Sequence, residues 1–259
     1  MRDYGGTISN VLSFEESGLR EFYLEELECP EFMEDAFNNI KLAFPVEEKE
    51  KTFKINRTYL IWKSIVDRVL SLLALIVLSP FFVFLIAIIK VVDSGKAIYK
   101  SKRVGKDGKE FYVYKFCSMK EGADSFVHLS EEELREYQVN FKIKNDPRVT
   151  KLGDILRKTS LDELPQILNI LKGEMSIIGP RPVLFEEVMF YGEYADTLLK
   201  MKPGLTGYWQ AYARSNVSSY EHGDRQILEL TYVSKCSVGF DIKIFFKTIV
   251  SILKKEGAI

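Results

Sequence analysis

The sequence predicts an α+β, mainly helical chain with one membrane-inserted segment, a small β-hairpin and surface amphipathic helices. Three observations carry this prediction: a charge-free apolar run from Val69 to Ile89, two short apolar–polar runs around Asp107-Gly108, and apolar residues at helical spacing along much of the remaining chain. A length of 259 residues allows one large domain or two small ones.

Charge is distributed unevenly along the chain. Residues 1–50 hold 13 acidic and 4 basic residues, whereas residues 51–259 hold 24 acidic and 32 basic residues. A basic larger part is typical of proteins that handle phosphates or anionic lipids, although common surface lysines and arginines explain it equally well. We interpret residues 1–56 as an acidic N-terminal extension of unknown role, for which simple packing is favoured over regulation or dimerisation.

The cysteines and the N-terminus exclude some classes of protein. Cys29, Cys117 and Cys236 are far apart and form no CxxC pair, which argues against a disulfide framework or a structural zinc site. The N-terminus has no apolar signal region, so the soluble parts are expected in the reducing cytoplasm. The sequence contains no P-loop, dinucleotide-binding glycine motif or protein-kinase motif set, so nucleotide handling by those routes is unsupported.

The run from Val69 to Ile89 has 21 residues without a charge, which is long enough for a membrane helix. Ser79-Pro80 lies near its middle, and the helix is expected to kink or break there because proline removes a backbone hydrogen bond. Basic residues flank both ends about equally, whereas a single spanning helix normally shows a bias. A re-entrant helix-break-helix over residues 57–96, which enters and leaves the membrane on one face, fits both features.

The part after this anchor, residues 97–259, begins with the predicted hairpin, whose turn is Asp107-Gly108. Ser130 and Glu133 form a capping box at the start of an exposed helix over 130–144. Further on, apolar residues recur at helical spacing from 164 to 171, and Gly173 is the stop signal of that helix. Residues 241–255 place apolar residues opposite lysines. Such a basic amphipathic helix either packs into the core or lies on a membrane surface, and the sequence favours neither.

The stretch from Arg157 to Gln166 is the most informative for chemistry. Asp162 and Glu163 are adjacent at the expected start of a helix, although Ser160 and Glu163 alone would make an ordinary capping box. Arg181 lies between two prolines, which restrict where its guanidinium points. Acids beside fixed bases form simple ion pairs, or a site where a metal ion and arginines bind phosphates while a carboxylate attacks phosphorus.

A set of motifs in order along residues 60–257 resembles the bacterial sugar transferase family, the monotopic polyprenyl-phosphate phosphoglycosyl transferases. The motifs are Lys63-x-x-x-Asp67-Arg68, Ser79-Pro80, Arg103-Val-Gly, Tyr114-Lys-Phe, Asp146-Pro-Arg, Thr159-Ser-Leu-Asp-Glu-Leu-Pro-Gln166, Gly173-Glu-Met-Ser, Gly179-Pro-Arg-Pro182, Lys202-Pro-Gly-Leu-Thr-Gly207 and Asp241-Ile-Lys. Residues 1–56 have no counterpart in the shared motifs.

The resemblance implies transfer of a hexose 1-phosphate from a UDP-sugar to undecaprenyl phosphate with release of UMP. This reaction would initiate an exopolysaccharide, capsule, O-antigen or glycoprotein glycan. It implies Mg²⁺ as cofactor and a catalytic domain, residues 97–259, on the cytoplasmic face of the bacterial inner membrane. Expected partners are membrane lipid and downstream glycosyltransferases, with homodimerisation left open and nucleic acid not expected.

The resemblance also assigns roles to residues. Asp162 would be the nucleophile that forms an aspartyl phosphosugar intermediate, and Glu163 would position the metal or activate the lipid phosphate; both acids are the expected metal ligands. Lys115, Arg157 and Arg181 match positions that serve the substrate phosphates or the structure of the site. The chain departs from the family's usual pattern at Ser101, often glutamine, and at Cys117, often arginine.

Residues 207–215 match the part of the family where sugar preference is expected, although the sequence does not identify the sugar. Two other functions remain open at this point. The chain could be a catalytically silent membrane partner of a glycan assembly system, which the intact Asp162, Glu163 and Arg181 argue against. It could also be a glycosyltransferase that moves a sugar without its phosphate, which would release UDP rather than UMP.

Overall fold

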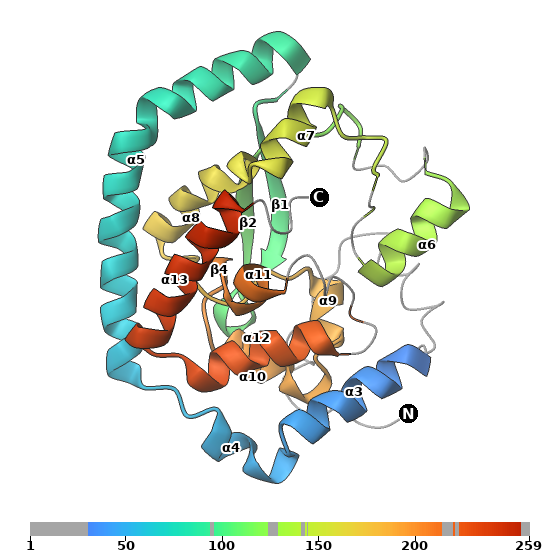
Figure 1. The fold of residues 1–259 in the computed structure, drawn as a ribbon, viewed down its shortest axis with the longest axis vertical. Coiled ribbons are helices and arrows are strands. Elements are labelled where there is room, and N and C mark those ends of the chain that lie inside the picture. Colours follow the sequence, from blue (N-terminus) through green and yellow to red (C-terminus); the bar gives the residue numbers. More distant parts are fainter. Residues whose placement is uncertain are drawn as a thin grey trace.

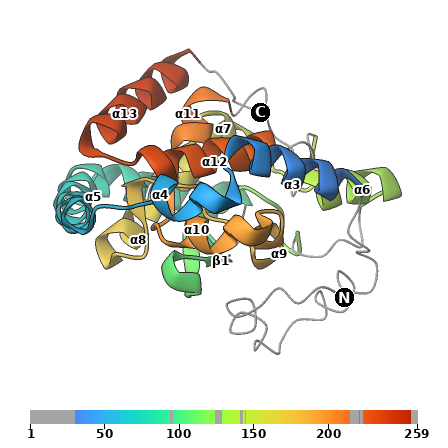
Figure 2. The ribbon, with the colours of Figure 1, turned by 90° about the horizontal axis from the view of Figure 1, so that it is seen from below.

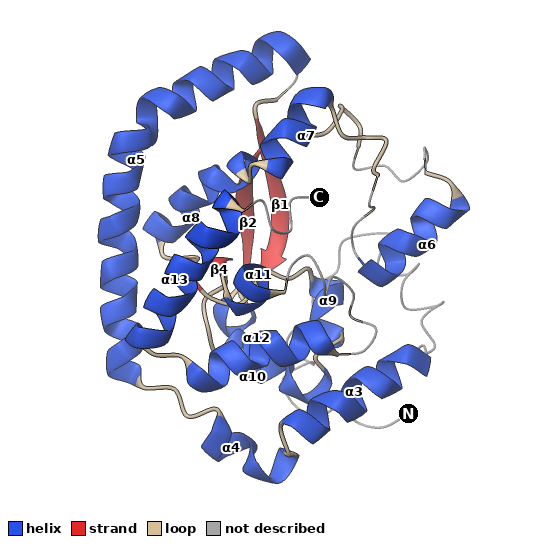
Figure 3. Cartoon of the chain, viewed as in Figure 1, coloured by secondary structure: helices blue, strands red, loops and turns tan. Residues whose placement is uncertain are grey.

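The computed structural model describes residues 31–93, 96–123, 129–140, 143, 145–213, 220 and 223–254. Helices dominate this part of the chain, and two small sheets complete it (Figure 3), which confirms the predicted mainly helical α+β class. The N-terminal helices are α3 (Glu31–Ala43), α4 (Lys49–Thr52) and α5 (Arg57–Asp93). After the first sheet follow α6 (Glu131–Asn140), α7 (Lys151–Lys158), α8 (Ile167–Lys172), α9 (Phe185–Met189), α10 (Ala195–Leu199), α11 (Tyr208–Tyr212), α12 (Asp224–Lys235) and α13 (Val238–Leu253).

Helix α5 contains the predicted apolar segment and lies along one edge of the molecule (Figure 1). Within the described residues it is the one helix long and apolar enough to cross a membrane, with a mean hydropathy of 3.1 over 18 residues. Only 11% of that window is buried. A core helix of a soluble protein would be mostly buried, so α5 is not one.

The predicted interruption at Ser79-Pro80 takes the form of a bend within one continuous helix (Figure 1). Pro80 has no N–H, so the carbonyl of Ile76, four residues earlier, loses its helical donor. The hydroxyl of Ser79 donates to that carbonyl at 2.9 Å. Serine before proline therefore satisfies the group that proline leaves unpaired, as a helix in an apolar environment requires.

Helix α5 is fixed to the rest of the protein at both ends. Near its start, Lys63 Nζ lies 2.6 Å from Asp241 Oδ2 at the beginning of α13. Beyond the bend, Leu85 and Ile89 are buried against Phe116. Between these places, the buried carboxylate of Asp67 accepts from the Ile177 amide at 3.2 Å. One side of α5 is therefore attached to the polar domain, while large apolar side chains stay exposed on the other.

The predicted β-hairpin is confirmed. Strands β1 (Ile98–Val104) and β2 (Glu110–Phe116) pair antiparallel, with Val104 opposite Glu110 at the turn. Asp107 and Gly108 both have positive φ, 58° and 73°, the conformation for which Asp-Gly turns are favoured. Local turn chemistry therefore sets the register of the strand that carries Lys115.

Asn169 on α8 attaches the hairpin to the helix behind it. This side chain is fully buried; its Oδ1 accepts from the Tyr114 amide at 3.1 Å, and its Nδ2 donates to the Tyr112 carbonyl at 2.7 Å. Gly173 ends α8 with φ 82°, as predicted. Strand β2 and helix α8 therefore form one unit.

A second, parallel sheet places the Gly-Pro-Arg-Pro segment. Strand β3 (Ser176–Ile178) pairs with β4 (Gly204–Thr206). A Cβ atom on Gly204 would lie 2.1 Å from the Gly179 backbone nitrogen, so the two strand ends approach as closely as they do because both residues are glycine. Arg181 leaves the sheet just beyond this contact.

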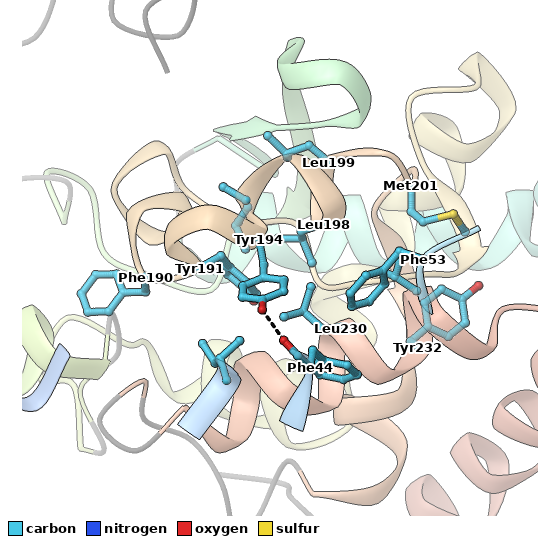
Figure 4. Close-up of a cluster of buried hydrophobic side chains, with 14 of the residues drawn as sticks. Phe44, Phe53, Phe190, Tyr191, Tyr194, Leu198, Leu199, Met201, Leu230 and Tyr232 are labelled. Carbon is cyan, nitrogen blue, oxygen red and sulfur yellow. Dashed lines mark hydrogen bonds between the residues drawn. The ribbon is translucent and has the colours of Figure 1, made fainter. Parts of the chain in front are cut away.

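The described part of the N-terminal extension contributes to the main core (Figure 4). Ile40, Phe44 and Phe53 are buried among residues of the later helices, including Leu230. The hydroxyl of Tyr194 donates to the carbonyl of Phe44. This is the packing role favoured from the sequence; residues 1–30 lie outside the described residues, and the domain boundaries at 56 and 96 stay predictions.

The two predicted surface helices are both present. Helix α6 begins with the predicted capping box, in which the Glu133 carboxylate accepts from the Ser130 amide at 2.8 Å and the Glu133 amide donates to the Ser130 hydroxyl at 3.2 Å. Helix α13 begins near α5, where Asp241 pairs with Lys63, and runs away from it at an angle (Figures 1 and 2). Its exposed apolar residues are Val238, Ile242, Phe245, Phe246, Ile249, Val250, Ile252 and Leu253. Lys255, the last residue of the predicted amphipathic stretch, lies outside the described residues.

Candidate active site

Asp162 and Glu163 lie in the first turn of a short 3₁₀ helix, Leu161–Gln166, between α7 and α8. The preceding residue Ser160 has a left-handed conformation, with φ 56°, and its side chain makes no capping bond. The capping-box explanation of Ser160 and Glu163 is therefore wrong. A non-glycine residue held in this conformation costs about 1–3 kcal/mol, and such positions cluster at functional sites.

Glu163 instead pairs with Lys115 across the junction between β2 and the 3₁₀ helix. The Lys115 Nζ and Glu163 Oε1 atoms are 3.0 Å apart, and the two side chains are 22% and 17% exposed. Partial burial strengthens such a pair relative to one in open water. Asp162 is itself buried, at 8% exposure.

A small open cleft lies beside this pair. Its apolar wall is formed by Val113, Pro182 and Leu205. Its polar lining residues are Arg103, Lys115, Glu163, Gln166, Arg181 and Gln210. Three cationic side chains around one carboxylate suit an anionic substrate that carries several charges, such as a diphosphate.

Arg181 enters the cleft under three constraints. Pro180 and Pro182 restrict the backbone on either side. The Arg181 amide donates to both carboxylate oxygens of Glu229 on α12, at 3.2 and 3.3 Å. The guanidinium lies 5.8 Å from the ring centre of Trp209, within the range of a cation–π contact.

The predicted residues are only partly brought together. Lys115, Glu163 and Arg181 line one cleft, whereas Arg157 is directed to Ser118, to which its Nε donates at 2.9 Å. Asp162 is next to Glu163 in the chain but is not among the residues that line this cleft. The nucleophilic role of Asp162 and the phosphate role of Arg157 therefore stay predictions.

Arg103, Gln166 and Gln210 line the cleft and were not among the predicted site residues. Arg103 could have been found, because the predicted hairpin turn sets the register. Arg103 lies opposite Phe111, and side chains of a strand alternate between two faces, which places Arg103 on the same face as Lys115. No comparable spacing rule connects Gln210 with the other residues of the cleft, because Gln210 lies on α11 and not on the hairpin.

Cys117, which stands where the family often has arginine, does not supply a replacement cation. Its Sγ donates to the Met119 carbonyl at 3.4 Å, and its side chain packs against the buried cluster that contains Leu156. The cations of the cleft come from β1, β2 and the segment after β3 instead.

A buried charge network lies behind the cleft arginines. Glu187 on α9 lies 3.6 Å from the Arg103 guanidinium and 3.4 Å from that of Arg225, and it accepts from the Tyr220 hydroxyl at 2.8 Å. Burial alone would raise the pKa of Glu187, but Arg225 and Arg103 outweigh it and hold the pKa below its ordinary value. Glu187 is therefore ionised, and it holds Arg103 from behind.

Comparisons with known proteins also indicate a sugar transferase. A family model described as bacterial sugar transferase matches residues 58–255. An uncharacterised sugar transferase of Haemophilus influenzae is 43% identical over 202 residues, which are 76% of this chain and 42% of that protein. The exopolysaccharide production protein ExoY of Sinorhizobium fredii is 40% identical over 196 residues, 74% of this chain and 85% of that protein.

A third relative matches nearly the whole chain. The undecaprenyl-phosphate galactose phosphotransferase of Salmonella typhimurium is 35% identical over 274 residues, 98% of this chain and 56% of that protein. The chain thus spans about half the length of the Haemophilus and Salmonella relatives.

A mainly helical domain with a cationic cleft beside paired acids fits a transferase of anionic substrates. The chain belongs to the bacterial sugar transferase family, which confirms the resemblance drawn from the motifs.

The buried acid Glu229 predicts a specific pH dependence of stability. Burial raises its pKa from 4.5 to about 7, although Arg225 acts in the opposite direction. Between these pH values the folded protein binds more protons at this group than the unfolded chain does, so this group makes stability fall as the pH rises through that window. We expect Glu229→Gln to lose this contribution, so that its Tm falls less than that of the wild type between about pH 5 and 8.

Thermal unfolding in detergent, followed by circular dichroism at several pH values, measures this difference. The exposed residue Glu132 on α6 supplies the control, since Glu132→Gln should retain the wild-type pH dependence. Equal pH dependence in the wild type and Glu229→Gln would show that Glu229 ionises normally.

Proposed function

We propose that the chain transfers a hexose 1-phosphate from a UDP-sugar to undecaprenyl phosphate, with release of UMP, as the initiating membrane step of a surface glycan. The observation that carries the proposal is the cleft lined by Arg103, Lys115, Arg181 and Glu163, in which Lys115 pairs with Glu163, the residue after Asp162. The name of the Salmonella relative, an undecaprenyl-phosphate galactose phosphotransferase, supports the lipid acceptor and the transfer of phosphate.

The charges of the cleft fit the first half of this reaction. A carboxylate is a weak nucleophile, and it is repelled by the negative charge of a diphosphate unless cations neutralise that charge. In the proposed step, an Asp162 oxygen attacks the phosphorus that bears the sugar. The bond from this phosphorus to the bridging oxygen breaks, and UMP leaves with that oxygen. Lys115, Arg103 and Arg181 are placed to neutralise the phosphate oxygens.

In the second half, an oxygen of undecaprenyl phosphate attacks the same phosphorus and displaces the Asp162 carboxylate. The product is a lipid diphosphate sugar, and the enzyme returns to its starting state. One site then serves a soluble and a lipid substrate in turn. The product would be the acceptor for downstream glycosyltransferases.

The residues present fit a Mg²⁺ ion only together with the substrate. No group of three or more His, Cys, Asp or Glu side chains that could hold a metal ion occurs among the described residues. Mg²⁺ commonly binds through one or two carboxylates and the phosphates of a substrate, and Asp162 with Glu163 offers that donor set. When bound, Mg²⁺ would supply further charge neutralisation at the phosphates.

The membrane attachment is proposed from the apolar surfaces of two helices, α5 and α13. Helix α5 exposes large apolar residues along most of its length, and α13, which begins at the Lys63–Asp241 ion pair with α5, exposes a second apolar face. Apolar surface of this extent is rare on soluble monomers and marks a membrane or protein interaction site. We propose that α5 enters the cytoplasmic leaflet of the inner membrane and returns at the Pro80 bend, while α13 lies on the membrane surface.

Replacement of the proposed nucleophile is the most direct test of the reaction. We expect Asp162→Asn to lower UMP release by about 1000-fold or more, because an amide cannot form the acyl phosphate. Purified protein is assayed with undecaprenyl phosphate, Mg²⁺ and a panel of UDP-sugars. Asp154→Asn is the matched control, since Asp154 is an exposed acid on α7. Turnover retained in Asp162→Asn would overturn the assignment, and release of UDP instead of UMP would indicate transfer of sugar without phosphate.

The metal requirement is tested in the same preparation. Treatment with EDTA should abolish UMP release, and Mg²⁺ added in excess should restore it. Thermal unfolding without substrate should be unchanged by EDTA, because the proposed donor set is completed only by the substrate phosphates. Full turnover in EDTA would exclude an essential metal.

Membrane topology is tested by the accessibility of residues at the two ends of α5. Thr58 and Lys96 are both exposed. In a cysteine-free background, Thr58→Cys and Lys96→Cys should both resist an impermeant thiol reagent added outside intact cells and react after the cells are permeabilised. Labelling of one of them in intact cells would establish a spanning helix.

A further inference from the structure

Glu229 is fully buried on α12, behind the cleft rather than in it. Both oxygens of its carboxylate accept from one group, the backbone amide of Arg181. Within Pro180-Arg181-Pro182 this amide is the only backbone donor, because proline has no N–H. The contact therefore joins α12 to the residue of the segment that brings a cation to the cleft.

The neighbouring backbone is held by other bonds. The Gly179 amide donates to Thr206 at 2.9 Å, the Gly204 amide donates to the Pro180 carbonyl at 2.7 Å, and the Val104 amide donates to the Val183 carbonyl at 3.0 Å. These bonds fix the segment before and after Arg181. At Arg181 itself, the Glu229 carboxylate sets the plane of the peptide from which the side chain leaves.

Stability does not account for a carboxylate in this place. A buried carboxylate costs desolvation energy that an apolar residue of the same shape would avoid. Burial also raises the pKa of Glu229 to about 7. Arg225, which lowers the pKa of Glu229 against this effect, has its ion pair with Glu187. The specific contribution of Glu229 is its carboxylate, both oxygens of which accept from the Arg181 amide.

We propose that Glu229 is a positioning residue, which sets the affinity of the cleft for the diphosphate of a nucleotide sugar by holding Arg181 at its backbone amide. Arg181 is then held at two points: Glu229 accepts from its backbone amide, and the ring of Trp209 contacts its guanidinium. A displacement of about 1 Å at such a group costs up to about 100-fold in rate. This inference rests on the proposed function of the same cleft.

A double-mutant cycle with UDP as the probe tests the proposal. UDP binding in the presence of Mg²⁺ is measured by calorimetry, and KM and kcat for the UDP-sugar are measured by UMP release. We expect Glu229→Gln to weaken UDP binding and raise KM by about 10-fold, with a smaller change in kcat, since one acceptor oxygen and the charge are lost. In an Arg181→Ala background, Glu229→Gln should have no further effect, because the two residues act as one unit.

Two further variants separate positioning from a general loss of structure. Gln226→Met removes two buried hydrogen bonds from the same helix, to Phe190 and Tyr220, and should lower Tm without weakening UDP binding. Glu229→Asp keeps the charge but shortens the reach, and should also weaken UDP binding; it serves if Glu229→Gln fails to fold. Additive losses in the cycle, or wild-type affinity in Glu229→Asp, would overturn the proposal. A wild-type protein that neither binds UDP nor releases UMP would refute the proposed function instead.

Discussion

The carboxamide of Asn169 accepts from the amide of Tyr114 and donates to the carbonyl of Tyr112, deep between strand β2 and helix α8. A shift of the strand along the helix would leave these backbone groups unpaired in the interior, at about 1–3 kcal/mol for each group. Lys115 follows Tyr114 on the strand, and the 3₁₀ helix that carries Glu163 leads directly into α8. The separation of Lys115 from Glu163 is therefore set by a neutral buried contact, and their ion pair is its consequence.

Features governed by local rules could be predicted from the sequence. The hairpin turn at Asp107-Gly108, the capping box at Ser130 and the stop at Gly173 each depend on a few neighbouring residues, and each is confirmed. The conformation of Ser160 could not be predicted in this way, since tertiary packing holds a left-handed residue where a capping residue was the simpler expectation. The motif match selected Asp162 and Glu163, but it could not show that Arg157 turns to Ser118.

The residues next to Glu187 and Glu229 in the sequence do not indicate that these acids lie behind the cleft. Glu187 and Glu229 come from α9 and α12, and each contacts an arginine about 50 to 80 residues away in the chain. Acids on short amphipathic helices are normally exposed, so their sequence context predicts solvent contact rather than burial. Burial of such an acid requires cations and hydroxyl groups in contact with its carboxylate. For Glu187 these are Arg103, Arg225 and Tyr220. The cleft arginines are thus held from the protein side, which leaves their other donors for the substrate.

The attachment of α5 to the polar domain bears on how a soluble and a lipid substrate meet. Beyond its bend, α5 packs Leu85 and Ile89 against Phe116, and Phe116 is the next residue after Lys115. The ring of Phe82 also lies 5.5 Å from that of Phe116. The cationic end of the cleft is therefore one residue away from the contact with the proposed membrane helix. A flexible linker would let the site move relative to the bilayer, whereas this packing fixes its height. A lipid phosphate at the membrane surface then needs no large domain movement to reach the site.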